Sequence, residues 1–157
     1  MSSARKENGR RLRRQPTAAV GESEIVFGDG LIGFPAWRRF ALRPGPPSSP
    51  LRRLECLDEP SVCLTVVDPL CLDPGYRVAA SKEDLLSLEL EDPAQALVLC
   101  TLTVRGEPPA VTANLLGPLL INPRSRLGRQ LVLADSGYSV RHPIAALAGG
   151  SAPREGA

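Results

Sequence analysis

The sequence has few of the residues that metal sites and catalytic centres commonly use. It contains one histidine, His142, and its four cysteines form no C-x-x-C pair, so a zinc site would need an unusual all-cysteine set. We therefore expect no metal and no cofactor. Cys63 and Cys100 fall inside apolar, strand-like runs, where free cysteines behave as small buried hydrophobic residues in a reducing compartment. The cysteine pattern thus predicts a cytoplasmic protein.

The sequence also lacks a long apolar segment. Its longest apolar run, residues 96–104, is far below the roughly 20 residues that a membrane-spanning helix needs, so we expect no membrane partner. The basic start continues into Gln15, Pro16 and Thr17 rather than into an apolar core, which argues against a secretory signal peptide. A chain of 157 residues is long enough for one domain that folds on a single core without disulfides. We expect this domain to be a monomer.

Charges of opposite sign are concentrated in different parts of the chain. The net charge is +2, but residues 1–14 carry six basic side chains against one acidic, whereas the other 143 residues carry 13 basic against 16 acidic. The mildly acidic remainder suits a basic protein partner better than a nucleic acid, which would require a clustered positive face. We therefore expect no direct nucleic-acid binding by the folded part.

Both ends of the chain have the composition of disordered segments. Residues 1–20 combine like charges with Pro16 and lack hydrophobic periodicity, and residues 145–157 are rich in small residues; such segments bury too little apolar surface to fold. The predicted organisation is a disordered basic tail over 1–20, a β domain over 21–144 and a disordered tail over 145–157. An alternative is an RNA-binding β-domain that uses the arginine tail as an arm, because arginines contact phosphates without a fold of their own.

Short apolar runs separated by turn residues predict an all-β, mainly antiparallel single domain. Their spacing is typical of a small β-barrel or sandwich. The run over residues 62–67 is apolar on both faces, which predicts a central strand. The expected strands cover residues 24–27, 38–42, 51–57, 62–67, 76–80, 96–105, 110–121 and 129–134.

One short helix is expected near the middle of the chain. Ser81, with Asp84 three residues later, resembles a capping box, in which each residue bonds the backbone of the other. A helix that starts there is expected to end at Asp92-Pro93. Its apolar stripe is predicted to consist of Leu85, Leu86 and Leu88.

The C-terminal third has the pattern of a β-hairpin. Apolar residues alternate from Val111 to Ile121, the turn cluster 122–125 (NPRS) follows, and a second apolar run ends at Leu133; alternation around a turn cluster predicts paired strands. Gly117-Pro118 interrupts the first strand. Because proline cannot donate a hydrogen bond to a ladder, we expect a bulge or an edge there.

Residues 28–33 (GDGLIG) satisfy the pattern G-x-G-x-x-G. A dinucleotide site of this type needs a helix that opens at the third glycine and a β-α-β context. Pro35 and Pro44 bracket only a short stretch after the motif, and the later elements are predicted hairpins. We therefore interpret the motif as a tight glycine turn.

Asp135, Ser136 and His142 are the one combination that could suggest a hydrolase. Such a trio requires convergence from supported elements and a nearby oxyanion hole, which a loop of this length supplies poorly. We interpret Asp135 and Ser136 as turn residues whose side chains bond local backbone amides. The sequence thus predicts that the protein is not an enzyme.

A series of motifs follows in order along the chain: residues 30–34 (GLIGF), 49–51 (SPL), 66–69 (VVDP), 97–103 (LVLCTLT), 112–118 (TANLLGP), 121–122 (IN), 130–133 (QLVL), Tyr138 and 141–143 (RHP). Together these motifs resemble the flagellar assembly factor FliW family. The resemblance covers about residues 24–144 and is densest in the C-terminal half.

The resemblance implies a non-enzymatic cytoplasmic factor with two protein partners. FliW-like proteins bind the small RNA-binding regulator CsrA and prevent it from repressing flagellin translation. They also bind flagellin, so that free flagellin competes for the factor and releases the regulator. A partner switch of this kind needs no active site.

We predict that three regions form the binding surfaces: the 114–122 strand, the 138–143 tail and the acidic helix region. Polar and aromatic residues such as Asn114, Tyr138 and His142 recur in the family motif where packing alone would not require them. The acidic side chains of the helix region would steer a basic partner. The alternative is that Asn114 and Asn122 only satisfy buried backbone groups and that the acidic residues form a solvated face. The predicted partner-binding residues are Asn114, Asn122, Tyr138, Arg141, His142, Glu83, Asp84, Glu89, Glu91 and Asp92.

Overall fold

The computed structural model describes residues 24–144, so both predicted tails lie outside the described residues. The described part contains one α-helix, α3 (Lys82–Ser87), and two short 3-10 helices, η1 (Pro69–Cys71) and η2 (Pro93–Gln95). No described helix has the length and apolar character needed to cross a membrane. The strands are β1 (Glu24–Phe27), β2 (Arg39–Pro44), β3 (Arg52–Cys56), β4 (Cys63–Val67), β5 (Leu97–Arg105), β6 (Ala110–Ala113), β7 (Leu119–Asn122), β8 (Leu127–Gln130) and β9 (His142–Pro143).

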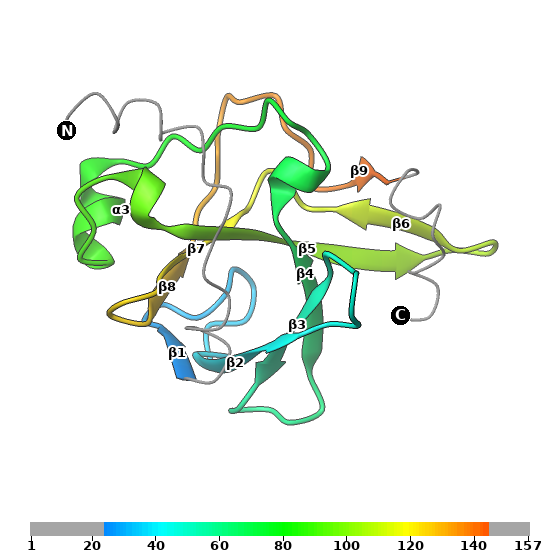
Figure 1. The fold of residues 1–157 in the computed structure, drawn as a ribbon, viewed down its shortest axis with the longest axis horizontal. Helices are drawn as coiled ribbons and strands as arrows, with labels where there is room; N and C mark the ends of the chain where they lie inside the picture. Colours follow the sequence, from blue (N-terminus) through cyan, green and yellow to red (C-terminus); the bar gives the residue numbers. More distant parts are fainter. Residues whose placement is uncertain (1–23, 145–157) are drawn as a thin grey trace.

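The strands form a small closed barrel with a lateral extension (Figure 1). The order β4-β3-β2-β1-β8-β7-β5 closes because β4 also pairs with β5, and closure leaves no free edge among these strands. Strands β6 and β9 continue the sheet beyond β5. The pair β1–β8 is parallel and the other described pairs are antiparallel. The predicted mainly antiparallel barrel is confirmed.

The alternation of side chains along the strands creates two hydrophobic cores. On β5, Leu97 and Leu99 belong to the barrel interior, whereas Val98 and Cys100 belong to a second cluster on the outer face. That outer cluster is covered by the helix region and by the C-terminal segment that ends at Ile144. Because residues 97–100 of β5 are buried on both faces, this part of the strand belongs to both cores. Each fully buried leucine contributes about 1.5 to 3 kcal/mol of transfer free energy.

The predicted strand over residues 110–121 is divided into two strands that both pair with β5. Ala113 lies opposite Leu102 and Leu119 lies opposite Leu99, so residues 114–118 face only Cys100 and Thr101. The expected bulge at Gly117-Pro118 is therefore present, and it is large. The predicted strand over residues 129–134 is only partly right, because β8 spans Leu127–Gln130 and residues 131–134 are not in a strand.

The predicted strand over residues 76–80 is wrong. This segment has no strand partner, because side chains satisfy its polar groups instead. The buried Tyr76 hydroxyl donates to the Leu115 carbonyl at 2.6 Å, and the Arg77 backbone N–H donates to the Tyr138 hydroxyl at 2.9 Å. A β-like apolar pattern here reflects packing against the outer core.

The capping box at the start of α3 is confirmed. The Ser81 hydroxyl accepts from the Asp84 N–H at 3.0 Å, and the Asp84 carboxylate accepts from the Ser81 N–H at 3.2 Å. The predicted apolar stripe is wrong at Leu86, which is 73% exposed, because a short helix turns this position away from the core. The predicted helix end at Asp92-Pro93 is also wrong, because α3 already ends at Ser87 and Asp92 caps the start of η2.

The glycine motif forms a tight turn, as predicted. Leu31 and Phe34 bond each other through both backbone groups, at 3.2 and 2.8 Å. Gly30 has a φ of +71° and a Cβ there would lie 2.4 Å from the Pro35 carbonyl oxygen, so only glycine fits. The chain then enters β2 and not a helix, which excludes the strand-to-helix junction of a dinucleotide fingerprint.

Candidate partner-binding surface

The bulge after β6 is stabilised by two side-chain amides. The Asn114 Oδ1 accepts from the Leu116 and Gly117 N–H groups at 3.1 and 2.8 Å. The Gln130 Nε2 donates to the Gly117 carbonyl at 2.9 Å, while its Oε1 accepts from the Ile32 N–H at 2.8 Å. Asn114 therefore has the structural role given as its alternative. Gln130, which our site prediction did not include, links the bulge to the glycine turn.

Asn122 performs a similar task at the other end of β7. Its Nδ2 donates to the carbonyls of Leu88 and Glu89 at 2.7 and 3.3 Å, and its Oδ1 accepts from the N–H groups of Arg124 and Ser125 at 2.9 and 3.4 Å. The residue is only 5% exposed. Asn122 thus links the segment after α3 to the turn between β7 and β8, and little of its own side chain is exposed.

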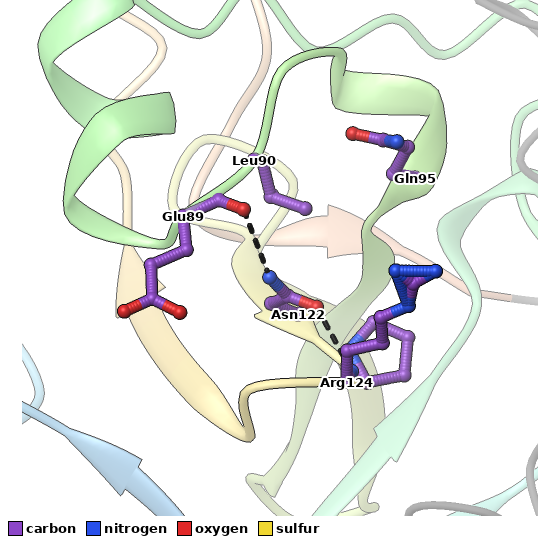
Figure 2. A pocket seen from close by; sticks show the side chains of 6 residues that line it. Glu89, Leu90, Gln95, Asn122 and Arg124 are labelled. Carbon is purple, nitrogen blue, oxygen red and sulfur yellow. Dashed lines mark hydrogen bonds between the residues drawn. The ribbon is translucent and has the colours of Figure 1, made fainter.

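A pocket opens between these two walls (Figure 2). It has a volume of about 160 Å³. The segment after α3 forms one wall, and the turn between β7 and β8 forms the other. The pocket brings together two predicted residues that are far apart in sequence, Glu89 and Asn122. The lining residues are Glu89, Leu90, Gln95, Asn122, Pro123 and Arg124.

The predicted acidic set divides into paired and unpaired carboxylates. Asp84, besides its capping bonds, lies 3.0 Å from the Arg129 Nε, and the Asp92 carboxylate accepts from the Ala94 N–H at 2.9 Å. These two residues are committed to the fold. Glu83, Glu89 and Glu91 are exposed, and within residues 24–144 they form no ion pair. Three of the five carboxylates are therefore available to a partner.

Glu89 is held in an uncommon backbone conformation next to the pocket. Its φ is +61°, in the left-handed region that non-glycine residues seldom adopt. The Asn122 amide bonds the carbonyls on either side of this bend, those of Leu88 and Glu89. The buried Asn122 amide therefore helps to fix the backbone of Glu89, and with it the direction in which the Glu89 side chain extends.

The predicted C-terminal residues lie on a different part of the molecule. The Tyr138 ring packs on Tyr76 with 4.6 Å between centroids, and its hydroxyl accepts the Arg77 N–H. His142 lies in β9 opposite Ala113, and both it and Tyr138 are half-buried, whereas Arg141 is exposed. Figure 1 shows β6 and β9 at one end of β5 and α3 at the other. The structure therefore separates the predicted residues into two surfaces.

The suspected hydrolase trio does not form a triad, because Asp135 and Ser136 lie in a turn whereas His142 lies in β9. The Ser136 Oγ accepts from the Tyr138 N–H at 3.1 Å, and the Ser136 N–H donates to the Leu133 carbonyl. Asp135 occupies the left-handed region with a φ of +62°. Within the described chain, no hydrogen bond joins Ser136 to His142 or Asp135. In this arrangement Ser136 forms hydrogen bonds with nearby backbone groups, and it is not activated as a nucleophile by a neighbouring base.

The cysteines differ in burial from part of our expectation. Cys56 and Cys100 are buried, but Cys63 and Cys71 are exposed. The expectation is wrong for Cys63, because its side chain follows that of its cross-strand neighbour Glu55 onto the outer face of the sheet. Burial raises the pKa of the Cys100 thiol to about 12, so this group stays protonated and poorly nucleophilic at neutral pH.

Comparison with known proteins identifies the family. The family model described as FliW protein matches residues 13–144. A flagellar assembly factor FliW from Natranaerobius thermophilus is 34% identical over 127 residues, which cover 80% of this chain and 84% of that protein. One from Pseudothermotoga lettingae is 36% identical over 126 residues, covering 78% and 79%.

The fold agrees with this relationship. A crystal structure of the flagellar assembly factor FliW superposes with a TM-score of 0.69 at 26% sequence identity, covering 76% of this chain and 84% of the other. The family model spans most of the sequence, and the barrel with its single described helix corresponds to that structure. The chain therefore belongs to the FliW family of flagellar assembly factors.

Proposed function

We propose that this protein is a cytoplasmic partner switch in flagellum biogenesis. It binds the translational regulator CsrA and relieves repression of flagellin mRNA translation, and it also binds flagellin. Free flagellin displaces the regulator, so that flagellin synthesis follows demand. Family membership carries this proposal, and a family of assembly factors calls for binding surfaces and not for catalysis.

The unpaired carboxylates in and after α3 form an acidic surface that supports the choice of a basic partner. Glu83, Glu89 and Glu91 are exposed and carry no intramolecular counter-charge within the described residues. Complementary charges across an interface raise the association rate and exclude wrong partners. An interface of about 1,200 to 2,000 Å² in total is an area that one face of this domain can provide. We assign the acidic surface to the regulator, which must itself be basic to bind RNA.

The second predicted surface, around Tyr138, Arg141 and His142, is available for flagellin. It includes the exposed side chain of Val140, which is 50% exposed, and the short edge strand β9. The two surfaces lie at opposite ends of β5. Flagellin can therefore displace CsrA only if one of the two interfaces extends over both surfaces, or if binding at one surface changes the affinity of the other.

The deciding experiment is a calorimetric titration of the full chain with CsrA from the same organism, repeated after saturation with flagellin. The proposal predicts heat of binding with CsrA alone and its loss in the presence of flagellin. Binding of both partners at once would exclude a switch. Absence of heat with either protein would exclude the proposed function.

The arginine-rich residues 1–14 favour one alternative, an RNA-binding β-domain that uses this arm. The arm carries six basic side chains against one acidic, so binding to RNA would weaken steeply as salt increases. A filter-binding assay of the full chain and of a variant without residues 1–14 distinguishes the two functions. RNA binding that is lost with the arm, together with no heat from CsrA or flagellin, would establish the alternative.

A further inference from the structure

We propose that the pocket between α3 and the β7–β8 turn binds a carboxylate group of a protein partner. The identity of that partner rests on the proposed function, whereas the site itself depends only on its own side chains. Two donor groups line the pocket, the Arg124 guanidinium and the Gln95 amide. Figure 2 shows the Arg124 side chain pointing toward Gln95, whereas the Glu89 carboxylate points away from both.

Both donors are free to bind a ligand. The Gln95 Oε1 already accepts from the N–H groups of Glu91 and Asp92 at 3.0 and 3.1 Å, which leaves the amide NH₂ to donate. Within residues 24–144, the Arg124 guanidinium has no hydrogen bond, and no carboxylate lies within ion-pair distance of it. A guanidinium presents a planar fork of donors that matches a carboxylate in a bidentate manner.

The pocket is built to hold this geometry. Asn122 bonds both walls through four backbone groups, so the position of the Arg124 backbone is set before a ligand arrives. Leu90 and Pro123 supply apolar lining, which reduces the local dielectric constant and strengthens a charge-assisted bond. Preorganisation of this kind lowers the entropic cost of binding.

The surroundings define which carboxylates are accepted. The exposed Glu89 lines the pocket, and the exposed Glu91 donates its N–H to the lining residue Gln95; both carboxylates repel a strongly acidic partner. The arrangement therefore selects a carboxylate on an otherwise basic surface, since basic neighbours would meet the flanking glutamates while the carboxylate reaches Arg124. The carboxylate could belong to an acidic side chain or to a chain terminus.

A titration with sodium acetate tests the site directly. The full chain, labelled with ¹⁵N, is titrated with acetate at constant ionic strength while the side-chain amide signals of Gln95 and Asn122 and the Arg124 Nε–H are followed. We expect saturable shifts at Gln95 and Arg124, and we expect the Gln95 shift to disappear in Arg124→Gln. The matched control is Arg105→Gln, which removes an exposed arginine near the tip of the β5–β6 hairpin. Shifts that fail to saturate, or that persist in Arg124→Gln, would overturn the proposal.

Two small ligands distinguish the source of the carboxylate. N-acetylalanine carries a terminal carboxylate, and N-acetylglutamate amide carries one on a side chain; the tighter ligand identifies the source. With the proposed regulator, Arg124→Gln is expected to lower affinity for CsrA by about tenfold or more, and Arg105→Gln is not. Equal affinity of Arg124→Gln and the unmodified chain for a bound partner would overturn the role in partner binding. If neither partner binds, the proposed function fails, and the acetate titration still decides the site.

Discussion

The side-chain Nδ2 of Asn122 donates a 2.7 Å hydrogen bond to the main-chain carbonyl of Leu88, 34 residues earlier in the sequence. This bond fastens the end of the short helix to the end of strand β7, and it sets the shape of the pocket between them. Two short elements of the described fold are thereby fixed relative to each other by one buried amide.

Replacing this amide is expected to weaken the fold. Asn122→Ala leaves buried backbone groups without partners, and we expect a loss of about 2 to 4 kcal/mol in the free energy of unfolding. Urea denaturation followed by circular dichroism measures this loss. Glu107→Ala, at an exposed position between β5 and β6, is the control. A loss below about 0.5 kcal/mol, the range of neutral surface changes, would contradict the structural role of Asn122.

The two glycines near β1 are expected to differ in their tolerance of alanine. A Cβ at Gly128 would lie 2.7 Å from the Phe27 ring, whereas a Cβ at Gly28 would meet nothing within 4 Å. Overpacking of a core costs about 1 to 3 kcal/mol, so we expect Gly128→Ala to lower the melting temperature and Gly28→Ala to leave it nearly unchanged. Equal melting temperatures of the two variants would show that Phe27 can move aside.

Asp58 is expected to make the fold sensitive to acid. Its carboxylate accepts from the N–H groups of Arg38 and Arg39 at 2.8 Å each, and these bonds, with the Arg39 side chain, lower its pKa below the usual 3.8. Because the folded pKa lies below the unfolded one, its stabilising effect is complete above the unfolded pKa and is lost as the pH falls through the folded pKa.

Asp58→Asn therefore flattens the dependence of stability on pH below about pH 4. Thermal unfolding of the unmodified chain and of Asp58→Asn between pH 2.5 and 6 measures the difference. Parallel curves for the two proteins would mean that other carboxylates cause the acid sensitivity.

The unpaired glutamates are expected to control the rate of association with a basic partner. A triple variant, Glu83→Gln with Glu89→Gln and Glu91→Gln, should slow association with CsrA by about tenfold or more at low salt and reduce its salt dependence. Stopped-flow fluorescence measures both quantities. Glu107→Gln serves as the control because it removes a distant exposed charge. Equal association rates of the triple variant and the unmodified chain would show that these glutamates do not steer CsrA.

The C-terminal surface can be tested without disturbing the fold. Tyr138→Phe keeps the ring contact with Tyr76 and loses only the acceptor for the Arg77 N–H, which costs about 1 kcal/mol. Combined with His142→Ala, it should weaken flagellin binding by calorimetry while the far-ultraviolet spectrum stays unchanged. Undiminished affinity would exclude both side chains from the interface.

The elements that could be predicted depend on residues close together in the chain. The capping box of Ser81 and Asp84 spans one helical turn, and the glycine turn at Gly30 depends on its own backbone angle, so both are visible as local patterns. The strand over residues 76–80 was predicted wrongly because only its local pattern could be read. Its apolar spacing matches a strand, but the partner that replaces a ladder, Tyr138, lies 61 residues away.

By itself, the sequence determined the all-β class, the local turns and caps, and the family, since each depends on composition, periodicity or a motif. Tertiary structure alone decided that β4 closes onto β5, that Gln130 reaches Ile32 across 98 residues, and that the predicted binding residues form two separate surfaces. The physical reason is that buried backbone groups take whichever partner the fold brings near. That proximity follows from barrel closure and not from position along the chain.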